Sequence, residues 1–457
     1  MKIANSKINP IGFVRLGLGM VLVSLGMGVA YAEEVPPGYV VNKANLSATD
    51  KQTFEGHNLG AMITPVMRKM IELNLTLTLA NTKPVINALP LMYAATEKYS
   101  GNVKYDRATR RISGYVAGIP FPNLSDTDPD LADKIIWNTF YSALPLTDIT
   151  FSTTKTYAID AIKGVQREAE LVNSTLKLNH RTSIEPIAPK AIGDGKIHQK
   201  LLVFNLAPQD ISGTGAYIQR YEDGRGDDSW AYVKSIRRVR RGSGGTWMNP
   251  IPGTDLANDE SACFSAFPTW YPKYTYIGKQ WVLGVMNGKA GVGSPPLALV
   301  DTKTPPYWNP IKQPWEPREV YVVDIATPEE HPSSRRRIYY GIKDNVILMC
   351  EMYDKKGSLW KFFPLTYAPT LLSDGQIGLG IPFAEIFDLQ RMHATYVDTQ
   401  YRHSNDARAN PDDWAPETLA DSVKFSIPVL KQKYGPADWF EALDPTEIAR
   451  RKAQAKR

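Results

Sequence analysis

Residues 227–241 read Asp-Asp-Ser-Trp-Ala-Tyr-Val-Lys-Ser-Ile-Arg-Arg-Val-Arg-Arg. In an extended chain, Trp230 and Tyr232 point to one face while Ala231 and Val233 point to the other, because side chains alternate along a strand. Glycines before and after this stretch indicate a turn at each end. The stretch therefore predicts β-strand structure bounded by turns, which favours a sheet protein over a helical one.

The second half of this stretch is strongly basic. Arg237, Arg238, Arg240 and Arg241 are separated only by one valine, and strand alternation places them on both faces. One interpretation is a solvated edge strand that its charges protect from pairing with other chains. The other is a rim of guanidinium groups that meets an anionic headgroup or an acidic partner, with Arg237, Arg238 and Arg240 as the rim residues.

The N-terminus has the layout of an export signal. Residues 1–32 begin with basic side chains, continue with an apolar run over 16–29 and end in Ala30-Tyr31-Ala32, a small-x-small cleavage pattern. The apolar run is short for a membrane span, and acidic residues follow it. We expect a cleaved signal peptide and no transmembrane segment in the mature chain. The expected location is the periplasm of a bacterium, and a peripheral association with the outer membrane stays open.

Charge after processing limits the kinds of partner. The predicted signal carries three basic and no acidic side chains, so the net charge of +6 falls to +3 in the mature chain. A value this close to neutral gives no support for a polyanionic partner. With export predicted as well, we expect no nucleic acid.

Cys263 and Cys350 are the two cysteines of the chain. An oxidising compartment makes a disulfide between them a reasonable hypothesis, and two separate buried thiols are the alternative. Nothing in their spacing resembles a cysteine zinc site.

The coarse pattern predicts an α+β protein dominated by a large antiparallel sheet. Helical spacing occurs early and again over 131–141, whereas the rest is rich in short alternating segments between turn residues. The predicted strands are 147–160, 165–178, 197–206, 214–222, 228–233, 236–241, 319–325, 335–342, 345–353 and 358–366. The predicted organisation is a signal peptide (1–32), a mostly helical arm (33–99), a curled sheet domain (100–445) and a flexible basic tail (446–457).

No motif for catalysis or metal binding is apparent. The six histidines form no His-x-x-x-His or His-x-His pair, and no Gly-x-Ser-x-Gly elbow is present. The carboxylates do not single out a pair at hydrolytic spacing. We therefore expect no enzyme activity, no metal and no cofactor.

Tryptophan and tyrosine are abundant, and such residues either fill a core or line a concave apolar pocket. A large sheet forms such a pocket by curling, with helices closing the open side. The candidate lining residues are Trp137, Phe140, Trp230, Tyr232, Trp270 and Tyr271.

Several separated motifs resemble one bacterial family. They are Gly114-Tyr-Val-Ala-Gly-Ile-Pro-Phe-Pro122 with Trp137-Asn138, the glycine-rich turn leading into Trp230–Arg241, and Arg335-Arg-Arg-Ile-Tyr-Tyr340 followed by Tyr353-Asp-Lys-Lys-Gly-Ser-Leu-Trp-Lys361. The family is the one called domain of unknown function 1329, often labelled an outer-membrane lipoprotein-sorting protein, and the resemblance runs over roughly 40–440. This chain departs from it at Gly242–Gly245, a glycine-serine insert, and over 282–318, which is rich in glycine and proline.

The resemblance implies a fold and a class of function. It implies the half-open antiparallel barrel of the periplasmic lipoprotein carrier and its outer-membrane receptor, closed by helices around an acyl-binding cavity. The family has no established catalytic residues to transfer to this chain. Its members are often encoded near large exporters and outer-membrane proteins, which implies a role in envelope transport.

Taken together, these observations predict a non-catalytic periplasmic carrier for a lipid-like or lipoprotein acyl cargo. Burial of an acyl chain gains about 0.8 kcal/mol per methylene, so no covalent step is needed. The expected partners are a hydrophobic ligand or an acylated protein, with an inner-membrane exporter or an outer-membrane protein as further candidates. Two alternatives stay open: an accessory or adaptor protein of an envelope exporter with a filled core, and, more weakly, a carbohydrate-active enzyme.

Overall fold

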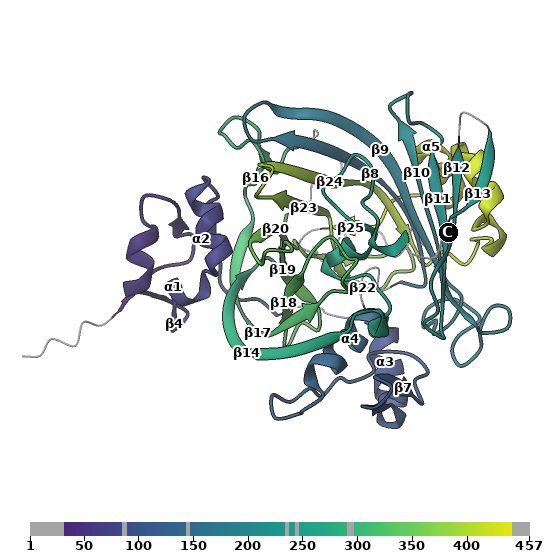
Figure 1. Ribbon diagram of the computed structural model, residues 1–457, viewed down its shortest axis with the longest axis horizontal. Coiled ribbons are helices and arrows are strands. Elements are labelled where there is room, and N and C mark those ends of the chain that lie inside the picture. The colour runs from purple at the N-terminus through teal and green to yellow at the C-terminus, as the bar shows by residue number, and fades with distance from the viewer. Residues whose placement is uncertain are drawn as a thin grey trace, which may run out of the picture.

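The computed structural model describes residues 32–84, 89–142, 147–233, 237–242, 246–289 and 297–440. Its dominant element is a sheet of 15 strands that curls around the middle of the molecule (Figure 1). The strands β14 and β17 lie on one side, β8 and β24 cross the top, and β10–β13 lie on the other side. The two end strands, β13 and β2, do not pair with each other, so the sheet is open.

The strands follow one another across the sheet in the order β13 (Arg238–Arg241), β12 (Asp228–Val233), β11 (Gly215–Tyr221), β10 (Ile197–Ala207), β9 (Gly164–Lys177), β8 (Ile149–Asp160), β24 (His393–Ser404), β23 (Phe383–Asp388), β20 (Leu359–Pro364), β19 (Ile347–Tyr353), β18 (Arg335–Gly341), β17 (Pro314–Ala326), β5 (Leu77–Leu79) and β2 (Val40–Val41). The fifteenth strand, β14 (Lys273–Gly284), pairs with β17 off this path. Neighbouring strands are antiparallel except β5, which runs parallel to β17. Many of these strands are rich in β-branched and aromatic residues, as in the Ile-Thr-Phe-Ser-Thr-Thr start of β8, which fit a pleated and half-buried surface.

Short strands outside the large sheet are β1 (Glu33–Glu34), β3 (Gln52–Phe54), β4 (His57–Asn58), β6 (Lys104–Asp106), β7 (Arg111–Ser113), β15 (Val300–Asp301), β16 (Asn309–Pro310), β21 (Ala368–Leu371), β22 (Ile377–Gly380) and β25 (Trp439–Phe440).

The helices are few and short. The α-helices are α1 (Leu59–Met62), α2 (Pro65–Glu72), α3 (Pro90–Tyr99), α4 (Leu131–Ser142) and α5 (Ile427–Tyr434). The 3-10 helices are η1 (Leu46–Lys51), η2 (Ser100–Asn102), η4 (Thr246–Met248), η5 (Asn258–Cys263), η6 (Pro268–Trp270), η7 (Pro411–Asp413), η8 (Pro416–Ala420) and η9 (Ser422–Phe425). Within the described residues, no helix combines the length and the apolar character needed to cross a membrane.

Local sequence explains where a helix begins. The hydroxyl of Thr64 accepts a hydrogen bond from the backbone N–H of Met67 at 3.3 Å, and Pro65 takes the first helical position of α2. Both are features of helix N-termini, since the first N–H groups lack intrahelical partners.

Two large clusters of buried apolar side chains hold the sheet. The larger one joins α1, α2 and one face of α4 to the strands β14–β24. The second packs β8–β11 against the C-terminal helices, through rings such as Phe151, Trp414, Phe425 and Tyr434. The C-terminal segment therefore covers the half of the sheet that ends in β13.

Residues 255–271, called here the anchor segment, are tied to the sheet by buried ion pairs. Arg336 on β18 donates from Nη2 to Asp259 Oδ2 at 2.8 Å and from Nη1 to the carbonyl of Cys263 at 2.8 Å. Lys361 on β20 lies 2.9 Å from Glu260 Oε2. Both carboxylates are inaccessible to solvent, and the guanidinium of Arg336 holds the pKa of Asp259 below its ordinary range despite its burial.

The fold class predicted from the sequence is confirmed: the protein is α+β, with a large, curled and open antiparallel sheet and few helices. Ten predicted strands match strands of the structure to within a few residues. Residues 33–99 are less helical than predicted, because they also form β1–β5, of which β2 and β5 join the large sheet. The predicted signal peptide, apart from Ala32, and the predicted tail lie outside the described residues.

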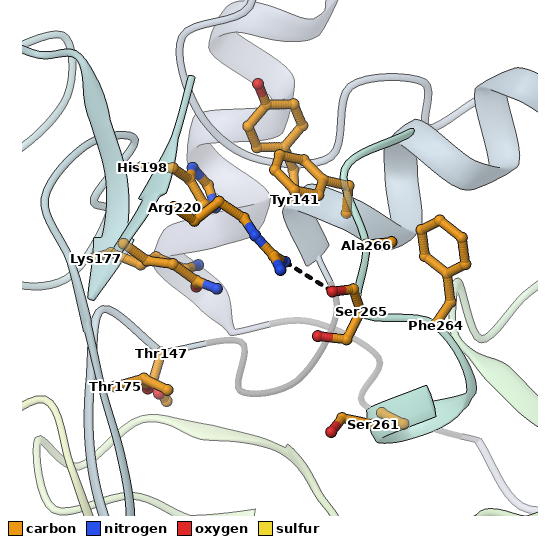
Figure 2. Close-up of a pocket in the computed structure, with 13 residues that line it drawn as sticks. Tyr141, Thr147, Thr175, Lys177, His198, Arg220, Ser261, Phe264, Ser265 and Ala266 are labelled. Carbon is orange, nitrogen blue, oxygen red and sulfur yellow. Dashed lines mark hydrogen bonds between the residues drawn. The ribbon is translucent and has the colours of Figure 1, made fainter. Parts of the chain in front are cut away.

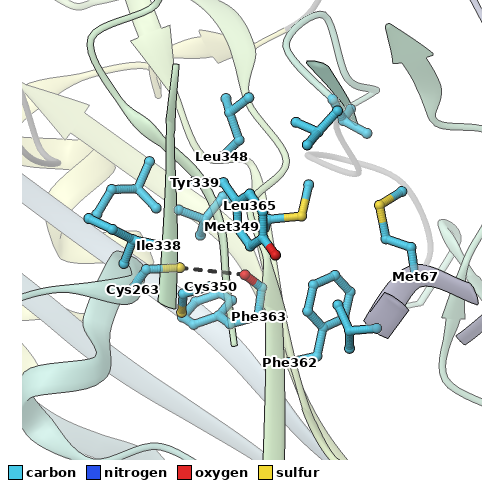
Figure 3. Packing of buried hydrophobic residues seen from close by; sticks show 14 of the residues in the cluster. Met67, Cys263, Ile338, Tyr339, Leu348, Met349, Cys350, Phe362, Phe363 and Leu365 are labelled. Atoms are coloured by element: carbon cyan, nitrogen blue, oxygen red, sulfur yellow. Dashed lines mark hydrogen bonds between the residues drawn. The ribbon is translucent and has the colours of Figure 1, made fainter. Parts of the chain in front are cut away.

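For Cys263 and Cys350 the sequence allows a disulfide or two separate buried thiols, and the structure has free, buried thiols. In Figure 3 the Cys263 thiol is directed at the carbonyl oxygen of Phe363, to which it donates at 3.4 Å. Phe363 is the cross-strand partner of Cys350, so the two thiols lie near each other and pack as small apolar groups.

We expect Arg336→Met to lower the free energy of unfolding by about 3–5 kcal/mol, because it leaves the Asp259 carboxylate buried without its cation. Urea denaturation measures the change. Arg335→Met is the matched control: Arg335 pairs with Asp324 at 2.8 Å on the partly exposed face, so its loss should lower stability by at most about 1 kcal/mol. Equal effects of the two variants would contradict the anchoring role.

A second expectation concerns Asp398 on β24, which is 2% exposed. Burial raises the pKa of Asp398 to about 6, although Gln400 donates to Oδ2 at 3.0 Å. Because the unfolded-state pKa is about 3.9, the wild type loses stability as the pH rises from about 4 to about 6. Asp398→Asn should therefore be more stable by about 2–3 kcal/mol above pH ~6.5, without a gain below pH ~4.

Thermal and urea unfolding across this pH range test the expectation. The exposed Asp412 provides the control variant Asp412→Asn, which should show no such pH dependence. If the gain in unfolding free energy of Asp398→Asn does not change with pH, the pKa of Asp398 is not raised by burial.

Candidate functional site

A cavity of about 70 Å³ lies beside α4 (Figure 2). Four parts of the chain form its wall: α4, Thr147 just before β8, the strands β9–β11 and the anchor segment. The lining residues are Phe140, Tyr141, Thr147, Thr175, Lys177, His198, Gln199, Arg220, Ser261, Ala262, Phe264, Ser265 and Ala266. The antiparallel neighbours β9, β10 and β11 place their contributing residues at the same end of the sheet, because adjacent strands run in opposite directions.

Two cations face this cavity, and they differ in their partners. Arg220 pairs with Asp227 at 2.7 Å and donates from Nη1 to the carbonyl of Ser265 at 2.8 Å, which ties β11 to the anchor segment (Figure 2). Lys177, the last residue of β9, has no carboxylate within 4.0 Å among the described residues. Burial lowers the pKa of Lys177, and the more distant charge of Asp148 only partly offsets this. Lys177 is therefore the cation that is available to a ligand.

The rest of the wall is aromatic on one side and hydroxylic on the other. Phe140 stacks on His198 with ring centroids 4.8 Å apart, and Phe264 lies across the cavity on the anchor segment (Figure 2). Thr147 and Thr175 lie near the Lys177 side (Figure 2). A cavity with one cation that lacks a carboxylate partner among the described residues, together with hydroxyl groups and aromatic rings, suits the anionic end of an amphiphilic molecule.

A second cluster of polar groups adjoins the cavity through His198. Glu222, directly after β11, places Oε1 at 3.0 Å from Nε2 of His180 and 3.0 Å from Nδ1 of His198. Burial raises the pKa of Glu222, but His198 and the hydrogen bonds from both imidazoles outweigh it, so the pKa lies well below its ordinary range. Burial also lowers the pKa of His198. This cluster brings two imidazoles and a carboxylate together within 4.8 Å.

The six aromatic residues predicted to line one cavity lie in three different clusters. Trp137, Phe140 and Trp270 pack together around Phe267, and of the six only Phe140 lines the cavity described above. Tyr271 is fully buried in the main core, where its hydroxyl binds Asp259.

The third cluster contains the pair from the opening stretch of the sequence. Trp230 and Tyr232 belong to the cluster under the C-terminal helices. There Trp230 contacts its cross-strand partner Tyr217, with ring centroids 5.2 Å apart. Trp230 and Tyr232 of β12 therefore pack in a core cluster.

The predicted arginine rim lies away from this cavity. Arg238 and Arg240 are exposed on β13, the end strand of the sheet, and Arg237 is exposed in the turn before it. This placement agrees with the alternative interpretation, an edge strand protected by charge. Arg241 pairs with Asp228 on the neighbouring strand.

Sequence reasoning missed Lys177, Arg220, His180, His198 and Glu222. A usable signal was present: Lys177 and His180 lie at the end of one predicted strand, His198 at the start of the next and Glu222 at the end of the third. In an antiparallel meander these three positions meet at one edge.

Comparisons with known proteins agree with the resemblance found in the sequence. The family model described as protein of unknown function (DUF1329) matches residues 42–420. None of the curated proteins is similar in sequence to this chain.

Solved structures with a similar arrangement share little sequence with this chain. A putative outer membrane lipoprotein-sorting protein domain from Vibrio parahaemolyticus is 14% identical, with a TM-score of 0.41, over 60% of this chain and 91% of that one. A DUF1329 family protein from Desulfovibrio piger is 16% identical, with a TM-score of 0.41, over 60% and 92%. A LolA superfamily protein from Nitrosomonas europaea is 12% identical, with a TM-score of 0.38, over 63% and 98%. Because the family model spans most of the sequence, this protein belongs to the DUF1329 family.

Proposed function

We propose that this protein is a non-catalytic, periplasmic binding or carrier protein for an amphiphilic ligand with an anionic end, such as a lipid-like molecule or an acyl group. The observation that carries the proposal is the Lys177 ammonium group, which faces a cavity with an aromatic wall and has no carboxylate partner among the described residues. The predicted export signal supports the location.

The charge of Lys177 favours an anionic ligand. A charged group that is removed from water without a counter-charge is destabilised, which is why burial lowers the pKa of Lys177. An anion bound in the cavity would supply the missing charge, and the hydroxyl groups of Thr147 and Thr175 offer hydrogen bonds to it. Charge-assisted hydrogen bonds of this kind contribute about 1.5–3 kcal/mol.

The volume of the cavity limits how much of a ligand it can hold. At about 70 Å³ the cavity is much smaller than common small-molecule sites of about 300–1,000 Å³. It therefore suits the anionic end and the first carbons of a ligand, whose apolar part would lie against Phe140 and Phe264. Each methylene removed from water would contribute about 0.8 kcal/mol.

A specific observation favours a second candidate, an adaptor protein of an envelope exporter. The anchor segment packs into the curled sheet with Asp259, Glu260 and Cys263 fully buried, so the protein's own residues occupy much of that interior. In the carrier proposal the cargo must therefore bind at the α4 and β9–β11 side. In the adaptor proposal no cargo binds at all.

A pair of ligands separates these possibilities. We expect the wild-type protein to bind a long-chain fatty acid more tightly than the alcohol of equal chain length, because only the acid carries a charge for Lys177. Lys177→Met should weaken binding of the acid by roughly 10- to 100-fold, corresponding to one lost charge-assisted contact, and should leave the alcohol almost unaffected. Displacement of a fluorescent fatty acid measures both affinities.

Lys200→Met is the matched control, since Lys200 is also partly buried on β10 but does not line the cavity. It should bind both ligands as the wild type does. If neither ligand binds to the folded wild-type protein, the carrier proposal fails and the adaptor is favoured.

A further inference from the structure

The cluster of His180, His198 and Glu222 has features that the binding of an amphiphile does not use. His180 follows β9, His198 lies on β10 and Glu222 follows β11, so three neighbouring strands each contribute one side chain. Each offers one potential ligand atom, and these atoms lie within 4.8 Å of one another. We propose that these three residues bind one divalent transition-metal ion, with zinc as the first choice.

The donor set selects this class of ion. Two imidazole nitrogens and one carboxylate oxygen suit zinc and its first-row neighbours, whereas calcium and magnesium prefer all-oxygen sites. Three protein ligands leave one position of a tetrahedral zinc ion for a water molecule or another group.

The distances fit such a site. Ligand atoms that bind one tetrahedral zinc at about 2.0–2.1 Å are about 3.3 Å apart. Glu222 Oε1 lies 3.0 Å from Nε2 of His180 and 3.0 Å from Nδ1 of His198. The three ligand atoms lie within 4.8 Å of one another, so side-chain rotations that bring the two imidazole nitrogens closer together around the carboxylate would create the required spacing.

The hydrogen bond on the far side of His180 is the strongest observation. Its Nδ1 lies 2.7 Å from the carbonyl oxygen of Val116, and a carbonyl only accepts, so Nδ1 carries the proton. This leaves Nε2 as the ring atom that faces the carboxylate oxygen of Glu222, 3.0 Å away. A metal-bound histidine commonly donates its other N–H to a backbone carbonyl in the same way.

The surroundings hold these side chains in place. His180 has a left-handed backbone with φ of 57°, which is uncommon for a residue with a side chain. Tyr115 lies 4.7 Å from the His180 ring and 3.9 Å from the ring of Tyr141, and Phe140 stacks on His198. Such an apolar shell limits water around a metal site and fixes the orientation of its ligands.

The metal site and the anion site can be tested separately. His180 and Glu222 do not line the cavity, and Lys177 is no part of the metal cluster. Substitution of His180 should therefore abolish metal binding and leave fatty-acid binding unchanged. Lys177→Met should weaken fatty-acid binding and leave metal binding unchanged.

The experiment uses the mature chain without a polyhistidine tag, first treated with a chelator and then titrated with zinc. We expect about one zinc ion per chain. His180→Gln and Glu222→Gln should each weaken zinc binding by more than about 100-fold, beyond the 10- to 100-fold typical of outer-shell changes. Cobalt(II) in place of zinc should give the visible absorption of a tetrahedral site in the wild type and not in these variants.

His57→Gln is the control, because His57 stacks on Trp281 with ring centroids 3.8 Å apart and lies outside the cluster. It should keep the wild-type affinity. Circular dichroism verifies that each variant folds. A further measurement needs no variant: X-ray absorption of the zinc-loaded wild type should show nitrogen and oxygen ligands at about 2.0–2.1 Å. A wild type that binds no zinc, or a His180→Gln variant that binds it equally well, would overturn the proposal and leave a direct contact between His180 and Glu222.

Discussion

The buried ion pair between Arg336 and Asp259 is the constraint on which much of the structure depends. It fixes η5 against β18, and the same guanidinium binds the carbonyl of Cys263. The next residues of the anchor segment then form one wall of the cavity. A buried ion pair adds little to stability relative to apolar packing, but it strongly disfavours any arrangement that separates its charges. Its main effect here is to fix the position of a segment whose regular structure is two short 3-10 helices.

One edge of the sheet carries two different polar sites because three consecutive antiparallel strands end or begin there. The short connection after β9 separates Lys177 from His180, and α4 contacts His198 through Phe140 and His180 through Tyr141. Within such a covered region, electrostatic interactions are stronger than in water. The result is a site in which Lys177, which has no carboxylate partner among the described residues, lies close to a carboxylate held between two imidazoles.

Much of the fold could be predicted from local pattern, and the site could not. Alternation identified strands such as β10 and β12, and apolar spacing identified α4. The strand β14 was missed because a bulge between Tyr276 and Gly278 and the exposed Ile277 interrupt the alternation, and prolines lie nearby. The pairing of β2 and β5 with the large sheet involves only two and three residues and contacts distant in sequence. Lys177, His198 and Glu222 look ordinary one by one, since their significance arises only when strand pairing brings them together. From the sequence, Trp230 and Tyr232 on β12 could line a pocket or fill a core. In the structure they pack in the cluster under the C-terminal helices.

The parallel pairing of β5 with β17 has a consequence for how the chain is made. Thr82, just after β5, donates to the carbonyl of Pro317, a partner 235 residues later in the chain. The early part of the polypeptide therefore cannot complete its structure until most of the remainder has been synthesised. Contacts between such distant residues slow folding, because the intervening chain must first be brought together against its entropy. We expect newly made chains to stay unfolded long enough to need protection from aggregation.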